Sequence, residues 1–242
     1  MFNPTRLVAV LTLLSVVAVA QQPQFTYLRF NEDLGNLTWN DAAMASNNAT
    51  LGGTASFGFQ RLGCSSLVAG MTSSSRCETG RSINFTGDFT IECWVRYSST
   101  STSTGAIYAF GSSTTGSFRC FRGGAAGVDG LLLRLPNGGD TTITGVTADT
   151  WHHVAWTYDE SALEVTPFLN GVAQPAQPVT AAIDLSTWLT STLCVGGHTS
   201  SNSWDGQIDE FRFWTEERSA SDIMNLMLRE IDPNVVMRLN GQ

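Results

Sequence analysis

The sequence contains no lysine, and its thirteen basic residues are all arginine. Twenty-one acidic residues outnumber them, which gives a formal net charge of −8 at pH 7. Proteins that bind nucleic acid or anionic lipid through charge need basic patches on their surface. The acidic balance therefore argues against nucleic acid and anionic membrane surfaces as partners.

Long hydrophobic runs are also scarce, and the longest lies at the start of the chain. Arg6 precedes LVAVLTLLSVVAVA, residues 7–20, which ends in Ala-Val-Ala before Gln21. A charged start, a short apolar run and a small-residue cleavage site are typical of a secretory signal peptide. The run is shorter than the roughly 20 residues of a membrane span. We therefore expect a signal peptide at 1–20, a secreted domain at 21–242 and no membrane insertion after cleavage.

Common catalytic motifs are missing as well. The chain has no G-x-S-x-G nucleophile elbow, no P-loop and no dinucleotide fingerprint. Asp205 and Asp209, the best candidates for a pair of catalytic carboxylates, would lie roughly 13 Å apart on an extended strand. Glycosidases need about 5 to 5.5 Å for retention or about 6.5 to 9.5 Å for inversion. We therefore predict that the protein is not an enzyme.

Cysteines and glycosylation sequons fit an exported chain. The five cysteines are an odd number, so at least one stays unpaired within the chain. A hairpin turning at Gly70 would place Cys64 opposite Cys77, with Cβ atoms about 4.5 to 5.5 Å apart, so we predict a disulfide there. The alternatives of other pairing and of buried thiols stay open for Cys93, Cys120 and Cys194. Three sequons between candidate strands predict glycosylation at Asn36, Asn48 and Asn84.

Alternating apolar and polar residues, rich in β-branched and aromatic types, dominate the rest of the chain. Glycine, asparagine and serine clusters separate a dozen such stretches, which is typical of an all-β sandwich. The candidate strands cover residues 25–30, 65–70, 82–87, 88–97, 105–111, 117–121, 130–135, 151–159, 163–171, 191–197, 207–214 and 234–239. A capping box at Ser219–Asp222, followed by Ile223 and Leu226, predicts one short C-terminal packing helix.

Two of the three histidines, His152 and His153, are adjacent in TWHHVAWTYD. Consecutive side chains of a strand point to opposite faces, so the two rings cannot converge on one metal ion. The third histidine, His198, falls in a predicted loop. The pair therefore indicates an ordinary strand, with a metal ligand or general base as the alternative.

Seven short motifs, in this order, carry a resemblance to a known family: LRFNED, NDAAMASNNATL, FTGDFTIECWV, TWHHVAWTYD, FLNGV, LCVGG and DGQIDEFRFWTEERSASDI. The resemblance that they carry covers residues 24–240. The chain resembles the LamG-like jelly-roll domains of the concanavalin A-like lectin/glucanase superfamily, in the laminin G-like and pentraxin-like group. The resemblance implies an all-β, two-sheet antiparallel jelly-roll sandwich with one concave face.

The resemblance also bears on function, because most members of this family are non-catalytic. They bind glycans or proteins, or they serve as structural modules outside the cell. The glucanase relatives carry a Glu-x-Asp-x-x-Glu strand motif, which this sequence lacks.

Some relatives bind calcium, a hard cation that takes six to eight oxygen ligands. Four acidic residues at or beside the family landmarks form the predicted site for a structural Ca²⁺: Glu32, Asp33, Asp41 and Asp209. Asn31 replaces the family's usual aspartate and removes one charge from this region. Solvated acids and turn caps are the alternative.

The loop HTSSNSWDG is the predicted ligand-binding segment. Sugar binding commonly pairs an exposed aromatic ring with amide and carboxylate groups, and Trp204 has such neighbours. The predicted set is His198, Asn202, Trp204 and Asp205. Packing of the tryptophan within the loop is the alternative.

Taken together, the sequence predicts a secreted, non-catalytic binding or adhesion module for a glycan or an extracellular protein, assisted by calcium. A structural subunit of an extracellular assembly or coat is the first alternative, and a glycan-active hydrolase of the same fold is the second. The oligomeric state is open, and a homo-oligomer is compatible with either binding or assembly.

Overall fold

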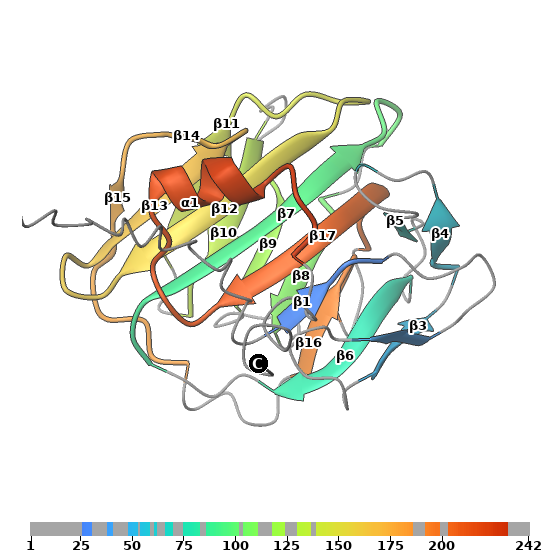
Figure 1. Cartoon of the computed structure of the whole chain (residues 1–242), viewed down its shortest axis with the longest axis horizontal. Coiled ribbons are helices and arrows are strands. Elements are labelled where there is room, and N and C mark those ends of the chain that lie inside the picture. The colour runs from blue at the N-terminus through green and yellow to red at the C-terminus, as the bar shows by residue number, and fades with distance from the viewer. Residues whose placement is uncertain are drawn as a thin grey trace, which may run out of the picture.

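The computed structural model describes residues 26–30, 38–40, 48–52, 54–58, 61, 66–69, 75–82, 86–101, 104–110, 118–123, 130–136, 139–185, 192–198 and 203–231. Two antiparallel sheets lie face to face as two layers, and one helix rests on the outside of the front layer (Figure 1). This confirms the all-β, two-sheet jelly-roll sandwich.

The layer that carries the helix, sheet A, has nine strands. Their main order is β14-β13-β12-β7-β17-β5-β4, with β1 also paired to β17 and β15 to β13. The bounds are β1 Thr26–Leu28, β4 Ser56–Gly58, β5 Ser66–Ala69, β7 Phe89–Tyr97, β12 His152–Asp159, β13 Glu164–Leu169, β14 Val172–Ala173, β15 Gln177–Pro178 and β17 Gly206–Trp214.

The opposite layer, sheet B, has eight strands in the order β11-β10-β9-β8-β16-β6-β3-β2. The bounds are β2 Thr38–Asn40, β3 Asn48–Gly52, β6 Arg76–Ser82, β8 Ala106–Phe110, β9 Phe118–Arg122, β10 Gly130–Arg134, β11 Asp140–Thr144 and β16 Thr192–Val195.

The core lies between the sheets and is rich in aromatic rings. Phe89 is central, because its ring centroid lies 5.2 Å from that of Tyr158, 5.6 Å from Phe118 and 6.1 Å from Phe213. All four side chains are fully buried. Burying each such side chain stabilises the fold by about 1.5 to 3 kcal/mol, so the contacts between these four rings tie strands of both sheets together.

A β-bulge in β17 changes which side chains face outwards. Asp209 pairs with Trp94 and Arg212 pairs with Glu92, so two residues of β17 stand opposite the single residue Cys93. Within the bulge Glu210 has a φ of 51°. An extra residue in one strand resets the alternation that follows it. Asp209 and Arg212, three residues apart, therefore both project from the outer face of sheet A.

The predicted packing helix is confirmed as α1, Ala220–Leu226, with Ser219 as its N-cap and a complete capping box to Asp222. Ile223 is buried against Ala155 and Phe168 of sheet A. Among the described residues, no helix is both long and apolar enough to span a membrane.

Several sequence predictions need correction. The hairpin expected to join residues 64–77 is wrong, because β5 belongs to sheet A and β6 to sheet B. The strand expected at 82–87 is also misplaced, since β6 ends at Ser82 and residues 86–88 are not in a strand. Short polar strands were missed, namely β2, β3, β4, β6, β11, β14 and β15.

Other predictions fall wholly or partly outside the described residues. The signal peptide, the strand at 234–239, Asn36 and Asn84 lie there, and glycosylation at Asn48, which begins β3, stays a prediction. Cys64 also lies there, so its disulfide with the buried Cys77 stays a prediction although the expected hairpin does not form. Three fully buried thiols remain unpaired, as the sequence left open: Cys93, Cys120 and Cys194.

Candidate functional site

The adjacent histidines have separate surroundings, as the strand pattern predicts. His152 Nε2 lies 3.2 Å from the Thr147 amide nitrogen and 3.0 Å from its hydroxyl. Burial lowers the pKa of His152. The ring of His153 points to the outer face of sheet A, where Nε2 lies 3.4 Å from Glu92 Oε2 and the ring packs edge-on against Trp94. The two rings contact different side chains on opposite faces of β12, which confirms the separation that the strand pattern predicts.

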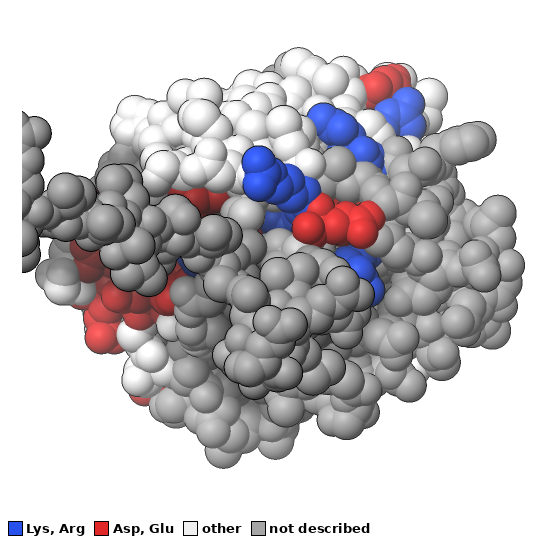
Figure 2. Space-filling model, viewed as in Figure 1, with Lys and Arg blue, Asp and Glu red and all other residues white. Residues whose placement is uncertain are grey.

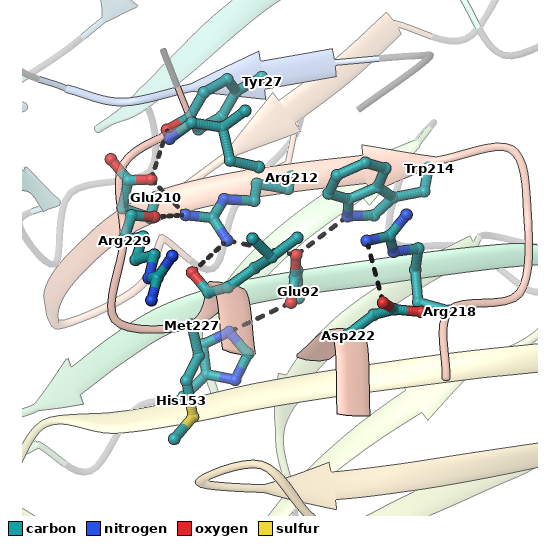
Figure 3. Close-up of polar contacts among 12 residues, drawn as sticks. Tyr27, Glu92, His153, Glu210, Arg212, Trp214, Arg218, Asp222, Met227 and Arg229 are labelled. Atoms are coloured by element: carbon teal, nitrogen blue, oxygen red, sulfur yellow. Dashed lines mark hydrogen bonds and ion pairs between the residues drawn. The ribbon is translucent and has the colours of Figure 1, made fainter. Parts of the chain in front are cut away.

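His153 belongs to a buried group of polar side chains beneath α1, which we call the ionic cluster: Tyr27, Glu92, His153, Glu210 and Arg212 (Figure 3). Arg212 lies at its centre. Its Nη2 donates to Glu210 Oε2 at 2.7 Å, and its Nη1 lies 3.5 Å from Glu92 Oε1. Tyr27 donates its hydroxyl to Glu210 at 2.6 Å, so one cation holds two carboxylates on neighbouring strands.

The charges of this cluster depend on one another. Burial alone would raise the pKa of Glu92, but contact with His153 and the charge of Arg212 lower it to about 2. Burial raises the pKa of Glu210 despite the same arginine. Burial would lower the pKa of Arg212, but the two carboxylates raise it above the ordinary arginine value. Glu92 and Arg212 therefore form a charged pair inside the protein.

The ionic cluster also anchors the end of α1 and the chain that follows it. Arg212 donates to the carbonyls of Leu226 and Arg229, and Trp94 donates its indole N–H to the carbonyl of Met227 at 2.6 Å. Helix C-termini present unsatisfied carbonyls and a partial negative charge, so a buried cation there is stabilising. The side chains of Arg212 and Trp94 thus hold the C-terminal end of α1 on sheet A.

Of the four predicted calcium ligands, the structure describes only Asp209. Glu32, Asp33 and Asp41 lie outside the described residues. Asp209 is fully buried, and its two oxygens accept from the backbone N–H groups of Arg61 and Glu210, both at 2.9 Å. The part of the chain that the structure describes holds no group of three or more His, Cys, Asp or Glu side chains suited to a metal ion. The calcium site therefore stays a prediction.

In the predicted ligand-binding loop, the two rings that the structure describes, those of Trp204 and His198, are buried. Trp204 is 1% exposed, packs edge-on against Tyr97 and donates its indole N–H to the carbonyl of Arg96. This is the packing role that the sequence offered as the alternative. His198 is also fully buried, Asp205 is partly exposed, and Asn202 lies outside the described residues. Ligand binding by this loop stays a prediction, without an exposed aromatic ring among its described residues.

A second set of charged side chains lies on the outer face of sheet B. We call it the arginine face: Arg76, Glu78, Arg119, Phe121, Arg134 and Asp140. Strand register places Arg119 of β9 directly opposite Arg134 of β10, and Arg134 directly opposite Asp140 of β11. Directly paired residues project from the same face of a sheet. Inward neighbours such as Cys120 and Leu133 fill the core instead.

Two arginine–carboxylate pairs frame this face. Arg134 donates to both oxygens of Asp140 at 2.8 Å, and Arg76 donates through Nε to Glu78 at 2.8 Å. Paired guanidinium and carboxylate groups offer donors and acceptors in fixed planes. Both carboxylates are partly exposed, so the pairs are open to solvent.

Between the pairs lies Arg119, stacked on an aromatic ring. Its guanidinium carbon lies 4.8 Å from the centroid of Phe121, and that of Arg134 lies 5.1 Å from the same centroid. Burial lowers the pKa of His198, and the charges of Arg119 and Arg76 lower it further, so this ring lies near both arginines. Burial and Arg134 together lower the pKa of Arg119. Three arginines and two carboxylates give the arginine face a formal excess of one positive charge, in a chain whose net charge is −8.

The sequence did not identify the arginine face. The stretch SFRCF was assigned to a strand, and its alternation already places Arg119 and Phe121 on the same side. Their meeting with Arg134 and Asp140 depends on the register of three strands, one of which, β11, was missed.

A family model matches residues 70–224 of the chain, which include most strands of both sheets and most of α1. It describes the concanavalin A-like lectin/glucanases superfamily. The chain belongs to this superfamily. A search of curated proteins found no match to this chain.

Solved structures with a similar fold include carbohydrate-binding and receptor-binding domains. One is domain 4 of AbnA, a GH43 extracellular arabinanase from Geobacillus stearothermophilus, which was solved with arabinotriose. It has a TM-score of 0.62 and is 16% identical in sequence. The match covers 85% of this chain and 98% of that domain. The botulinum neurotoxin type G receptor binding domain has a TM-score of 0.61 and 13% identity. The serotype D ligand binding domain, solved with N-acetylneuraminic acid, has a TM-score of 0.59 and 13% identity.

The match to each neurotoxin domain covers 85% of this chain and 50% of the domain. The superfamily fold is therefore lectin-like, and several of its structural neighbours bind glycans.

Proposed function

We propose that the protein is a secreted, non-catalytic module that binds a glycan through the arginine face of sheet B. The observation that carries this proposal is the alignment of two partly exposed arginine–carboxylate pairs with an aromatic-backed arginine on one outer sheet face. Sugar hydroxyls both donate and accept hydrogen bonds, so a surface that offers both in fixed planes suits them. The glycan complexes of two domains with the same fold support the same class of ligand.

The absence of catalysis belongs to the proposal and has its own support. Glu92 and Glu210 are almost fully buried, and both are engaged by Arg212. Arg134 and Asp140 form a bidentate pair on adjacent strands, so both oxygens of that carboxylate already accept from a guanidinium. A glycosidase needs one protonated and one ionised carboxyl group flanking the sugar.

Binding to immobilised glycans tests the proposal. The natural sequence and two variants, Arg134→Ala and Arg229→Ala, are applied to an array of neutral and acidic oligosaccharides. Arg229 is an exposed arginine beyond α1, on the opposite side of the molecule, and serves as the matched control. We expect Arg134→Ala to weaken binding by about tenfold, the typical loss for a charge-assisted hydrogen-bonded pair, and Arg229→Ala to leave it unchanged. Binding that survives Arg134→Ala would contradict the proposed surface.

Calcium assistance is a separate part of the proposal. Differential scanning calorimetry with calcium and with EDTA tests it, because a cation that binds only the folded state raises the melting temperature. An unchanged melting temperature would show that calcium does not bind the folded protein, and the proposal for the arginine face would stand.

A second candidate, assembly with a protein partner, is favoured by an apolar patch. Val172, Met224 and Leu228 are 63%, 50% and 54% exposed, and the turn at Gly171 packs against α1. The surface over α1 is largely uncharged in Figure 2, while basic and acidic side chains lie next to each other beside it. Size-exclusion chromatography tests self-assembly, and a strict monomer would remove the homo-oligomeric form of this candidate.

A further inference from the structure

Arg119 has no hydrogen-bond acceptor among the described residues. A guanidinium carries five N–H donors, and it stays charged under all ordinary conditions. The Nε of Arg119 is buried away from solvent and has no partner. The three other arginines of sheet B with described side chains each donate to an acceptor: Arg76 to Glu78, Arg122 to the carbonyl of Ser101 and Arg134 to Asp140. The donors of Arg119 are thus left without the acceptors that its neighbours have.

The surroundings hold Arg119 in place without neutralising it. Phe121 supports the guanidinium through a cation–π contact. Arg134 stands directly opposite on the next strand, and His198 lies near as well. Asp140 acts on Arg119 only through space, because Arg134 occupies both of its oxygens. A buried donor without an acceptor is unfavourable, and the adjacent like charge adds to that cost.

The side chains next to Arg119 in its row across sheet B are small on the side away from Arg134. Arg119 is paired there with Ala109 of β8, whose side chain is a single methyl group, and Ala109 is paired with Cys194 of β16. The nearest large side chains of the row are therefore the two arginine–carboxylate pairs. Arg134 is one strand away from Arg119, about 4.8 Å, whereas Glu78 is three strands away on the other side, roughly 14 Å.

We propose that Arg119 binds the oxyanion of an acidic sugar, either a carboxylate or a sulfate. The inference rests on the proposed function and assigns the ligand class of that same site. A planar guanidinium matches such oxyanions with two parallel N–H···O bonds. The Arg134–Asp140 pair then contacts the hydroxyl groups of the same sugar, and the more distant Arg76–Glu78 pair contacts those of a sugar further along the oligosaccharide. An oxyanion at Arg119 supplies the acceptors and the negative charge that the site lacks.

Matched pairs of ligands test this assignment. Isothermal titration calorimetry compares polygalacturonate oligomers with their methyl esters, in which the carboxylate is masked, and dextran sulfate with dextran. Three proteins are used: the natural sequence, Arg119→Gln and the control Arg229→Ala. Glutamine keeps two amide N–H donors but removes the positive charge. Because Arg119 has no hydrogen-bond acceptor among the described residues, Arg119→Gln is expected to unfold at the same temperature as the natural sequence, which calorimetry of the variant checks.

We expect the natural protein to prefer at least one oxyanion-bearing ligand over its neutral counterpart by about tenfold or more, as a charge-assisted bidentate contact predicts. Arg119→Gln should lose that preference and keep the affinity for the neutral form, while Arg229→Ala keeps both. Preference within the galacturonate pair identifies the carboxylate, and preference within the dextran pair identifies the sulfate.

Other outcomes separate this inference from the proposed function. Equal binding of acidic and neutral forms by the natural protein, or an unchanged preference in Arg119→Gln, overturns the assignment of Arg119 and leaves glycan binding standing. Failure to bind any glycan, acidic or neutral, overturns the proposed function and the inference together.

Discussion

Two arginines on opposite outer faces of the sandwich, Arg212 and Arg119, show two uses of the same side chain. Each projects from the middle of a sheet and lies over an aromatic ring, at 5.3 Å from the Tyr27 centroid for Arg212 and at 4.8 Å from the Phe121 centroid for Arg119. Arg212 is 1% exposed and donates to carboxylates and carbonyls through both of its terminal nitrogens. Arg119 is half-buried and has no acceptor among the described residues.

The pKa values of the two side chains shift in opposite directions for a physical reason. Burial lowers the pKa of both, but Glu92 and Glu210 reverse this for Arg212, whereas Arg134 adds to it for Arg119. The first guanidinium is needed by the fold, which would otherwise contain two buried carboxylates without the cation that they share. The second is held in position at some cost to the fold, which is typical of a group that acts on a ligand.

Removing Arg212 should have the largest effect. Arg212→Met leaves Glu92 and Glu210 buried without their cation and frees the carbonyls at the end of α1. Breaking one side of a buried ion pair typically costs about 3 to 5 kcal/mol. Chemical denaturation measures this loss of unfolding free energy. A loss no larger than that of an exposed substitution would show that the ionic cluster does not anchor α1.

Acid should weaken sheet A through Glu92. Its folded-state pKa of about 2 lies below the ordinary value of 4.5. A depressed carboxyl pKa stabilises the fold fully above the unfolded value, and this contribution is lost as the pH falls from about 4.5 towards 2. The melting temperature should fall across this window, and less steeply for Glu92→Gln than for the natural sequence. Parallel slopes for the two proteins would contradict the depressed pKa.

Loss of one neutral contact of the anchor should have a smaller effect. Trp94→Phe removes the indole N–H that bonds to the carbonyl of Met227 but keeps an aromatic ring beside His153. The expected cost is about 1 kcal/mol for one hydrogen bond, plus the loss of ring area. Hydrogen exchange of the α1 amides checks whether that loss is local to the helix. Unchanged protection of α1 would mean that this bond does not hold it.

The smallest effect on stability is expected at the arginine face. Arg119→Gln should change the unfolding free energy by no more than about 0.5 kcal/mol, the range for surface substitutions without partners. The same denaturation experiment as for Arg212→Met gives the direct contrast. Destabilisation of Arg119→Gln on the scale of Arg212→Met would show that Arg119 is a structural residue.

The sequence predicts the buried strands well and the polar ones badly. Strands β7, β12 and β17 were found because apolar alternation marks a strand that packs on a core. Strand β6 was missed because its sequence, RCETGRS, is mostly polar, with Arg76 and Glu78 on the outer face. Propensity carries little signal where only one half of a short strand is buried.

The site residues are harder to predict because they meet through register rather than through sequence. Simple alternation puts Asp209 and Arg212 on opposite faces of β17, and only the bulge at Glu210 brings them to the same side. Likewise, Arg119 meets Arg134 through one pairing of β9 with β10. For the adjacent histidines simple alternation was sufficient, because it places their rings on opposite faces of β12, as the structure does.

The most direct test of acidic-glycan binding is a ratio of two affinities measured by calorimetry. The affinity for an acidic oligosaccharide is divided by the affinity for its neutral counterpart. This ratio is measured for the natural protein and for Arg119→Gln at equal folding stability. A ratio of about ten or more is expected in the natural protein, and a ratio near one is expected in the variant. The same ratio in both proteins would contradict the claim that the arginine face holds its free cation for an acidic glycan.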